Sequence, residues 1–384
     1  MVSIEWSKLQ RGAAAASVVL AACSSVPLRE SPPPAPPSPA PAAQAPAGLP
    51  GDALLHPRAR WVPVPWSELP GWGDDRALQA WPALQRGCEK PAPAWIFVCA
   101  QARGYAPPDD AALRDWFAQR LQPYRVEAHD GEAQGLATGY FEPLVDAART
   151  PREGFRVPLY APPADLVTRK PYWTRQQLDT LPAAQAALRG REIAYVADPL
   201  DALLLQVQGS GRLRLVDGNG APRVVRLAFA GHNDQAYKSV GRWLIEQGEL
   251  KAAEASWPAI RDWARRNPKR VNELLWSNPR VVFFREEPLP DANLGPRGAQ
   301  GVPLTPGRSV AVDAQSVPYG TPLWLDTTEP LSSTPLRRLV LAQDTGSAIV
   351  GAVRVDYFWG WGADAEAQAG RMKQPLRVWA LWPK

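Results

Sequence analysis

The chain has 384 residues, enough for one large domain or two smaller ones with a sizeable core. Hydrophobic residues make up 45% and charged residues 21% of it, which excludes wholesale disorder. The net charge of +5 is too small and too scattered to predict nucleic-acid binding. The 43 prolines, about twice the usual frequency, disfavour long helices and predict strands joined by fixed turns.

Residues 1–22 have the features of a lipoprotein signal peptide. Lys8 and Arg11 precede an apolar run from Gly12 to Ala22, whereas a helix that spans a bilayer needs about 20 apolar residues. No later run reaches that length without a charge or a proline, so no transmembrane helix is predicted.

Leu20-Ala21-Ala22-Cys23 resembles a bacterial lipobox, whose cysteine is lipidated and becomes the new N-terminus. The alternative is an ordinary cleavage site with an incidental cysteine; the short apolar run and the small residues before Cys23 favour lipidation. Ser24 stands where an inner-membrane retention signal would have Asp, so the resemblance implies an anchor on the periplasmic face of the outer membrane. Residues 23–60, low in complexity to about Leu55, are predicted to be a Pro/Ala-rich tether.

Cys88 and Cys99 form an even pair in the oxidising compartment that an export signal implies. A disulfide between them would stabilise the fold by about 3 kcal/mol. The three histidines (His56, His129 and His232) are not clustered and no Cys-x-x-Cys occurs, so neither a metal site nor a cofactor is predicted.

Residues 61–125 are predicted to be partly helical. Asp109 or Asp110 can cap a helix that Pro123 ends. The apolar face of this helix would be Leu113, Trp116, Phe117 and Leu121. Strands are then predicted for 202–207, 213–217 and 224–229, with a hairpin at 218–220. Helices follow at 237–250, 257–266 and 268–277, and strands at 309–313, 322–326, 338–343 and 353–357. This order predicts a small β module inserted into a larger α+β domain.

Gly209-Ser210-Gly211 is too short for a dinucleotide-binding loop, because Arg214 stands where the third glycine would be. The pattern predicts a tight turn that exposes backbone amides. The chain also lacks Gly-x-Ser-x-Gly and phosphate-loop motifs, which excludes the commonest hydrolase and nucleotide-binding classes.

Two aspartates near the C-terminus are candidate catalytic groups. Asp344 ends an apolar run before a glycine turn, and Asp356 lies inside a second apolar run. Gly346 and Gly351 can let the chain fold back and bring both to one site, where burial and a like charge would raise a carboxyl pKa, as a general acid needs. The alternative is that Asp344 caps a turn and Asp356 lies on a surface strand.

Asp344-Thr345-Gly346-Ser347 also resembles the active-site loop of aspartic proteases. Those enzymes need two such loops that share one proton, whereas this chain has one copy. In addition, Gln343 stands where that family has an apolar residue. An aspartic-type protease is therefore the less favoured alternative.

Seven ordered blocks, spread over most of the chain from Trp61 to Trp382, carry a further resemblance. They are Thr138-Gly139-Tyr140-Phe141-Glu142-Pro143, Gln206-Val207-Gln208-Gly209-Ser210-Gly211-Arg212, Tyr237-Lys238-Ser239-Val240-Gly241-Arg242, Asn278-Pro279 with Phe283-Phe284-Arg285-Glu286, Leu304-Thr305-Pro306-Gly307-Arg308-Ser309, and the stretches 343–351 and 354–360. Together, behind a lipobox, they resemble the membrane-bound lytic murein transglycosylase A family of peptidoglycan lytic exotransglycosylases.

The resemblance implies a mainly β fold with helices (α+β). A double-psi β-barrel domain would be interrupted by a second, smaller β-barrel domain, with the glycan in the groove between them. The inserted domain is expected at 138–237. Helical segments and the catalytic barrel are expected at 61–137 and 238–384, with the 3D domain at about 300–384.

The resemblance also implies residue roles. Asp356 would be the acid/base, supported through hydrogen bonds by Thr138 and by Asp344, which would orient its neighbour and raise that neighbour's pKa. The substrate-binding residues implied are Tyr140, Glu142, Gln206, Gln208, Gly209, Ser210, Gly211 and Tyr237. Among the 17 tryptophans, Trp359 and Trp361 are candidates for stacking on sugars, since they follow Asp356 closely. Val350 and Ser347 depart from the family, which commonly has Lys and Gly there.

The implied activity is cleavage of the β-1,4 bond between N-acetylmuramic acid and N-acetylglucosamine without water, in cell-wall turnover. The muramic C6 hydroxyl attacks its own anomeric carbon and forms a 1,6-anhydro ring; because this nucleophile is intramolecular, one carboxylic acid suffices, whereas ordinary glycosidases use two. The expected partners of a monomer are glycan strands and the outer membrane, with a cell-wall synthesis or hydrolysis complex as a candidate. A non-catalytic peptidoglycan-binding lipoprotein on the same scaffold is the alternative from another class.

Overall fold

The computed structural model describes residues 52–216, 222–252 and 254–384. The predicted signal peptide, Cys23, most of the predicted tether and the predicted hairpin turn at 218–220 lie outside these residues. Within the described part of the chain, no helix combines the length and the apolar character needed to cross a membrane.

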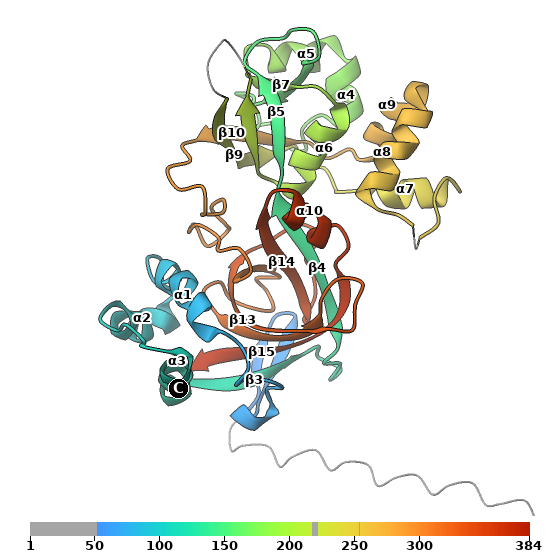
Figure 1. The fold of residues 1–384 in the computed structure, drawn as a ribbon. Coiled ribbons are helices and arrows are strands. Elements are labelled where there is room, and N and C mark those ends of the chain that lie inside the picture. The colour runs from blue at the N-terminus through green and yellow to red at the C-terminus, as the bar shows by residue number, and fades with distance from the viewer. Residues whose placement is uncertain (1–51, 217–221, 253) are drawn as a thin grey trace, which may run out of the picture. The chain divides into compact units, whose positions relative to one another are not determined.

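The larger sheet closes into a barrel. Among the described residues it has nine strands in the order β1-β2-β3-β15-β12-β13-β11-β14-β4, and β15 also pairs with β4, so that the last six of these strands form a ring. Two pairings in the ring, β11–β13 and β14–β4, are parallel. The strands are β1 (Leu54–His56), β2 (Ala59–Pro63), β3 (Leu121–Glu127), β4 (Gly135–Glu142), β11 (Ser309–Val312), β12 (Pro322–Thr328), β13 (Pro335–Asp344), β14 (Arg354–Trp361) and β15 (Lys373–Pro383). This closed barrel with helices around it confirms the predicted α+β class (Figure 1).

The second sheet is inserted between β4 and β11. Its order is β10-β9-β8-β5-β7-β6, and its outer strands contact each other, although no ladder joins them within the described residues. Its strands are β5 (Leu144–Ala148), β6 (Val157–Tyr160), β7 (Glu192–Val196), β8 (Gly211–Leu215), β9 (Arg223–His232) and β10 (Val282–Glu287). The expected end of the insertion at 237 is too early, because β10 pairs with β9 and extends this sheet to Glu287.

The start of the folded body also differs from the prediction. The predicted tether reached residue 60, but β1 and β2 form a hairpin there, and β2 pairs with β3. Ala59 and Trp61 are fully buried in the barrel core. This burial, which the proline-rich composition before it conceals, places the beginning of regular structure at Leu54.

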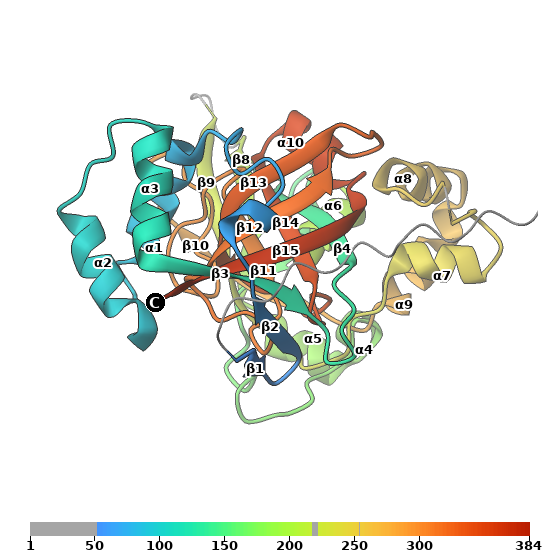
Figure 2. The same cartoon turned by 90° about the horizontal axis from the view of Figure 1, so that it is seen from below.

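The described helices form local groups around the two sheets (Figures 1 and 2). Those before β3 share a core with Trp324, Leu339 and Trp379 of the barrel, and α7, α8 and α9 pack around Trp263. The helices are α1 (Trp81–Gly87), α2 (Ile96–Arg103), α3 (Asp110–Arg120), α4 (Arg175–Thr180), α5 (Pro182–Leu188), α6 (Pro199–Gln208), α7 (Val240–Glu246), α8 (Trp257–Arg266), α9 (Val271–Ser277) and α10 (Ala363–Ala369), with 3-10 turns at Trp66–Glu68, Ala77–Ala80, Pro93–Trp95 and Pro268–Arg270.

Two features near α1 to α3 were predicted from the sequence. Asp109 caps α3 by accepting a hydrogen bond from the Ala112 amide at 2.8 Å. Leu121 and Pro123, expected to complete and end this helix, belong instead to β3. The predicted disulfide is present: Cys88 and Cys99 are bonded, with their Cα atoms 5.2 Å apart.

The segment 202–207 is helical, so the predicted strand there is wrong. Asp198 caps α6 through the Leu200 amide, Pro199 occupies its first turn, and Gly209 ends it with φ of 77°. The expected tight turn at 209–211 is therefore a helix C-terminus that leads directly into β8. This arrangement brings the end of α6 to the barrel, where the Gln208 side chain accepts a hydrogen bond from the Phe141 amide at 3.1 Å.

Candidate active site

The barrel places both candidate aspartates and Thr138 in one row. Ala311 on β11 pairs with Asp344 on one side and with Asp356 on the other, and Asp356 pairs with Thr138 on β4. Directly opposed residues of neighbouring strands face the same side of a sheet, so the side chains of this row point together. The sequence predicted that the chain folds back directly between the two aspartates. Instead, β11 lies between them and separates their Cα atoms by roughly 10 Å, two strand spacings.

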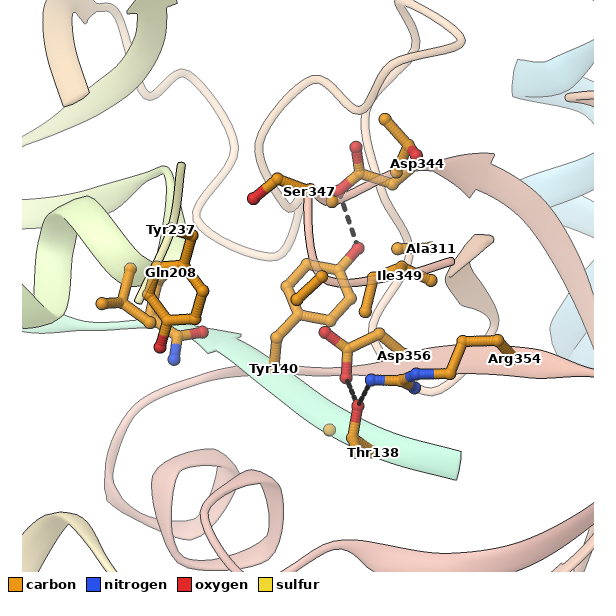
Figure 3. A pocket seen from close by; sticks show the side chains of 15 residues that line it. Thr138, Tyr140, Gln208, Tyr237, Ala311, Asp344, Ser347, Ile349, Arg354 and Asp356 are labelled. Carbon is orange, nitrogen blue, oxygen red and sulfur yellow. Dashed lines mark hydrogen bonds between the residues drawn. The ribbon is translucent and has the colours of Figure 1, made fainter. Parts of the chain in front are cut away.

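A groove runs over this row. A cavity of about 250 Å³ has barrel residues on one side and the insertion residues Gln208 and Tyr237 on the other (Figure 3). It adjoins a cavity of about 710 Å³ that shares Tyr140, Gln208 and Asp344 with it. The barrel residues of the smaller cavity include Thr138, Tyr140, Ala311, Asp344, Arg354 and Asp356.

Asp356 is held by a short chain of hydrogen bonds. Thr138 Oγ1 donates to Asp356 Oδ1 and accepts from Arg354 Nη2 at 2.9 Å (Figure 3). Because a guanidinium can only donate, the Thr138 hydroxyl proton is left for the carboxylate. Burial raises the pKa of Asp356, while the Thr138 bond and the charge of Arg354 lower it, with a net rise. The site therefore contains a fixed carboxyl group that keeps its proton more readily than an exposed aspartate.

Asp344 has a different environment. It accepts hydrogen bonds from the Tyr140 hydroxyl at 2.9 Å and from the Ala299 amide at 3.0 Å. Burial raises its pKa to about 6; its hydrogen bonds oppose this rise and the charge of Asp356 adds to it. Burial also raises the pKa of Tyr140 well above its ordinary value, so Tyr140 is a neutral donor. Asp344 was expected to raise the pKa of Asp356. Burial raises the pKa of Asp356 instead, and the charge of Asp356 adds to the rise in the pKa of Asp344.

Of the eight substrate-binding residues implied by the family resemblance, six line the groove and two do not. Gln206, Gln208, Gly209, Ser210 and Tyr140 line the larger cavity, and Tyr237 lines the smaller one. Glu142 is fully buried and binds Arg212 and Arg226, which differs from its expected role as a substrate contact. Gly211 is also inside the protein, where a Cβ atom would lie 2.0 Å from a methyl carbon of Leu205.

The two tryptophans after Asp356 lie outside the linings of both cavities. Trp359, three positions after Asp356, faces the opposite side of the strand. The strand register shifts between Phe358 and Trp361, and Trp361 pairs with Glu142 at the end of β4. Trp359 packs over Gly139, where a Cβ atom would lie 2.7 Å from its ring nitrogen. The ring of Trp361 lies 4.2 Å from the guanidinium carbon of Arg212.

Sequence reasoning missed two residues of the site. Arg354 precedes Asp356 by two positions on the same strand, and this alternation could have identified it. Ala311 offers no such signal, because only the strand register places its small side chain between the aspartates. Ser347, one of the departures from the family, lines both cavities, whereas Val350 is 55% exposed and lines neither. No group of His, Cys, Asp or Glu suited to a metal ion occurs in the described parts of the chain.

Asp344→Asn is expected to make folding stability less dependent on pH. The native pKa of Asp344 is raised to about 6, so the folded state binds more protons than the unfolded state and loses stability as the pH rises from about 4 to about 7. Asn removes this loss. The free energy of unfolding of the variant minus that of the wild type should therefore be about 1–3 kcal/mol larger at pH 8 than at pH 4. Urea unfolding across this range measures the difference.

The exposed Asp364, on the first turn of α10, offers a matched control for this measurement. Asp364→Asn makes the same chemical change at the surface and measures the general effect of removing one carboxylate. A difference between Asp344→Asn and the wild type that stays constant with pH would contradict the raised pKa of Asp344.

Comparisons with known proteins agree with this geometry. Two family models match the chain: the MltA specific insert domain over residues 136–285, and the 3D domain over residues 308–382. A curated relative from Vibrio cholerae, named membrane-bound lytic murein transglycosylase A, is 35% identical over 287 residues, which cover 70% of this chain and 74% of the relative.

Two solved structures are similar over most of their length. The lytic transglycosylase LtgG of Burkholderia pseudomallei is 45% identical, with a TM-score of 0.59, over 87% of this chain and 100% of that chain. E. coli MltA with bound chitohexaose is 26% identical, with a TM-score of 0.64, over 88% of this chain and 97% of that chain. The matched insert domain coincides closely with the second sheet, and the 3D domain contains β11 to β15 without the last residue of β15.

Proposed function

This chain belongs to the membrane-bound lytic murein transglycosylase A family, and from that premise we propose how its groove cleaves peptidoglycan. The protein is a lytic transglycosylase, a lyase that acts on glycan strands. It cleaves the β-1,4 bond between N-acetylmuramic acid and N-acetylglucosamine and leaves 1,6-anhydromuramic acid ends. The observation that carries this proposal is Asp356, a carboxyl group of raised pKa fixed by Thr138 on the floor of the groove.

Asp356 acts twice in the proposed reaction. Its protonated form donates to the glycosidic oxygen, and the bond from that oxygen to the muramic anomeric carbon breaks. The resulting carboxylate takes the proton of the muramic C6 hydroxyl while the C6 oxygen bonds to the anomeric carbon. No water is consumed, and the carboxyl group regains its proton at the end of each turnover.

Asp344 shapes the groove around the sugar. Its carboxyl group binds the Tyr140 hydroxyl and the Ala299 amide, and so joins β13 to β4 and to the segment before β11. Tyr140 lines both cavities. We assign Asp344 the role of holding this wall in place, separate from the proton transfers at Asp356.

Digestion of purified sacculi tests the function. A lytic transglycosylase releases 1,6-anhydromuropeptides, which mass spectrometry distinguishes from products with free reducing ends. Reducing ends would indicate a hydrolase. Intact sacculi that retain the protein would favour the non-catalytic binder, and cleaved cross-links with intact glycan would favour a protease.

Thr138→Val is expected to lower kcat by about ten- to a hundredfold, because it removes one hydrogen bond to a charged group. The Thr138 bond favours the carboxylate form of Asp356, so its loss should also raise the pKa of Asp356. The alkaline limb of the kcat/KM profile, where the acid loses its proton, should therefore move to higher pH. Thr138→Ser keeps the hydroxyl and should keep the profile; an unmoved limb in Thr138→Val would contradict the assignment.

Membrane attachment is the second part of the proposal. The relative from Vibrio cholerae is named membrane-bound, and the lipobox of this chain supports a lipid anchor at Cys23 in the outer membrane. Cys23→Ser should release the protein from the membrane fraction into the periplasm, as fractionation and immunoblotting would show. Retention of this variant in the outer membrane would contradict the anchor.

A further inference from the structure

The larger cavity of the groove is strongly basic. Its lining contains Lys90, Arg280, Arg285 and Arg297, and Asp344 is its one acidic residue among those that the structure describes. Burial and the charge of Arg280 lower the pKa of His232, which also lines the cavity, so His232 adds no charge at neutral pH. These cations come from both walls of the groove, and they lie beyond the row that contains Asp356.

On the barrel side, two cations meet at one turn. Arg297 donates to the Gly301 carbonyl at 3.1 Å, and a Cβ atom on Gly301 would lie 2.6 Å from the Lys90 ammonium. Among the described residues, the ion pairs within 4.0 Å include neither of these two side chains. Within the described residues, no carboxylate therefore neutralises these two cations through a direct ion pair.

On the insertion side, Arg280 also lacks an ion-pair partner among the described residues. Its side chain makes one hydrogen bond, to the Gln235 carbonyl at 3.1 Å, and no carboxylate of the described residues lies within ion-pair distance. Burial lowers its pKa, and the charge of Asp234, which makes no ion pair with it within 4.0 Å, opposes this effect, so the charge of Arg280 is partly desolvated. Arg285, in contrast, is bound by Glu287 at 2.6 Å.

A half-buried guanidinium with no carboxylate in direct contact gains from a ligand that supplies one. A guanidinium presents five N–H donors in a fixed fork, of which Arg280 uses one. A bound carboxylate would form charge-assisted hydrogen bonds with the others. Neutral sugar hydroxyls would gain much less from the same group.

We propose that Lys90, Arg280 and Arg297 form a carboxylate-binding part of the groove, which selects charged glycan over neutral glycan. This inference rests on the proposed function, since it assigns peptidoglycan to the groove. The carboxylates have two sources: the lactyl group of muramic acid in naked strands, and the peptide in peptide-bearing strands, where an amide occupies the lactyl carboxyl. A chitooligosaccharide has neither.

Binding to three ligands tests the proposal. The wild type and the variant Arg280→Gln/Arg297→Gln are compared in an Asp356→Asn background, which prevents turnover, with chitohexaose, naked glycan strands and peptide-bearing strands. The variant should bind at least one of the charged ligands about tenfold more weakly and chitohexaose equally well. The loss should shrink near 1 M salt, where screening is strong.

The exposed cations Arg265 and Arg371 provide a control with the same change in net charge. Arg265→Gln/Arg371→Gln should leave all three affinities unchanged. Weaker binding of peptide-bearing strands alone identifies the peptide carboxylates, and weaker binding of naked strands alone identifies the lactyl group.

Two results would overturn the proposal: unchanged affinity for both charged ligands, or an equal loss for chitohexaose. Failure of the proposed function is a separate result, since the absence of anhydro products from wild-type digests does not affect these binding measurements.

Discussion

Asp356→Asn is expected to reduce turnover by about 10²–10⁴-fold while glycan binding stays nearly unchanged. Asn keeps the shape of the side chain and can still accept from Thr138 Oγ1, but it has no proton to transfer to the glycosidic oxygen. The initial rate of release of soluble muropeptides from sacculi measures turnover. The dissociation constant for chitohexaose measures binding.

Asp344→Asn is the matched control for this prediction, since it makes the same chemical change on the neighbouring side of Ala311. It should reduce turnover less, because Asp344 holds Tyr140 and the Ala299 amide and transfers no proton in the proposed reaction. If Asp344→Asn were inactive and Asp356→Asn retained near wild-type turnover, the site would remain and the two roles would be exchanged.

Glu142→Gln is expected to lower the free energy of unfolding by about 3–5 kcal/mol. The Glu142 carboxylate is fully buried and accepts from Arg212 Nε at 2.7 Å and from Arg226 Nε at 2.6 Å. Gln would leave two buried guanidinium groups without a counter-charge. Urea or guanidinium unfolding measures the loss.

The buried cluster of Glu142, Arg212 and Arg226 also bears on the groove, because of where it lies. Glu142 ends β4, its two arginines lie on β8 and β9, and both arginines also donate to the Leu294 carbonyl of the segment that returns to the barrel. The cluster therefore joins both connections between the barrel and the insertion. A change here should alter KM as well as stability, because the two walls of the groove belong to the two parts.

Glu153→Gln, at an exposed position, should change stability by less than about 0.5 kcal/mol and serves as the control. A loss of similar size in both variants would contradict the assignment. The wild-type arrangement is not itself expected to be strongly stabilising, since buried ion pairs seldom outweigh their desolvation.

The fold was predictable where the sequence carries local signals. A cap and apolar spacing predicted α3, the helix predicted at 257–266 is α8, and strand patterns predicted β11 to β14. The α6 segment was misassigned because a short leucine-rich run suits either state, although Asp198 before it and Gly209 after it are helix signals. The closing strand β15 was missed because its place depends on pairing with β3, β4 and β12, which lie far away in the sequence.

Several residues of the site could be predicted from the sequence, but their arrangement in space could be predicted much less well. Asp344 and Asp356 were identified from their apolar surroundings and from the family resemblance. The intervening Ala311, in contrast, depends on a register among three strands. Trp359 was assigned to the groove from proximity in sequence, and strand alternation, a local rule, places it on the other face. Glu142 was assigned to substrate because its partners, Arg212 and Arg226, are distant in sequence.

Digestion of sacculi in water labelled with heavy oxygen tests the central claim most directly. If Asp356 alone serves as acid and base and the muramic C6 hydroxyl is the nucleophile, the new muramic ends are anhydro rings that contain no oxygen from the solvent. Mass spectrometry of the released muropeptides would then show unlabelled 1,6-anhydro products. New reducing ends that carry the heavy oxygen would show that water attacks the anomeric carbon, and would contradict the account.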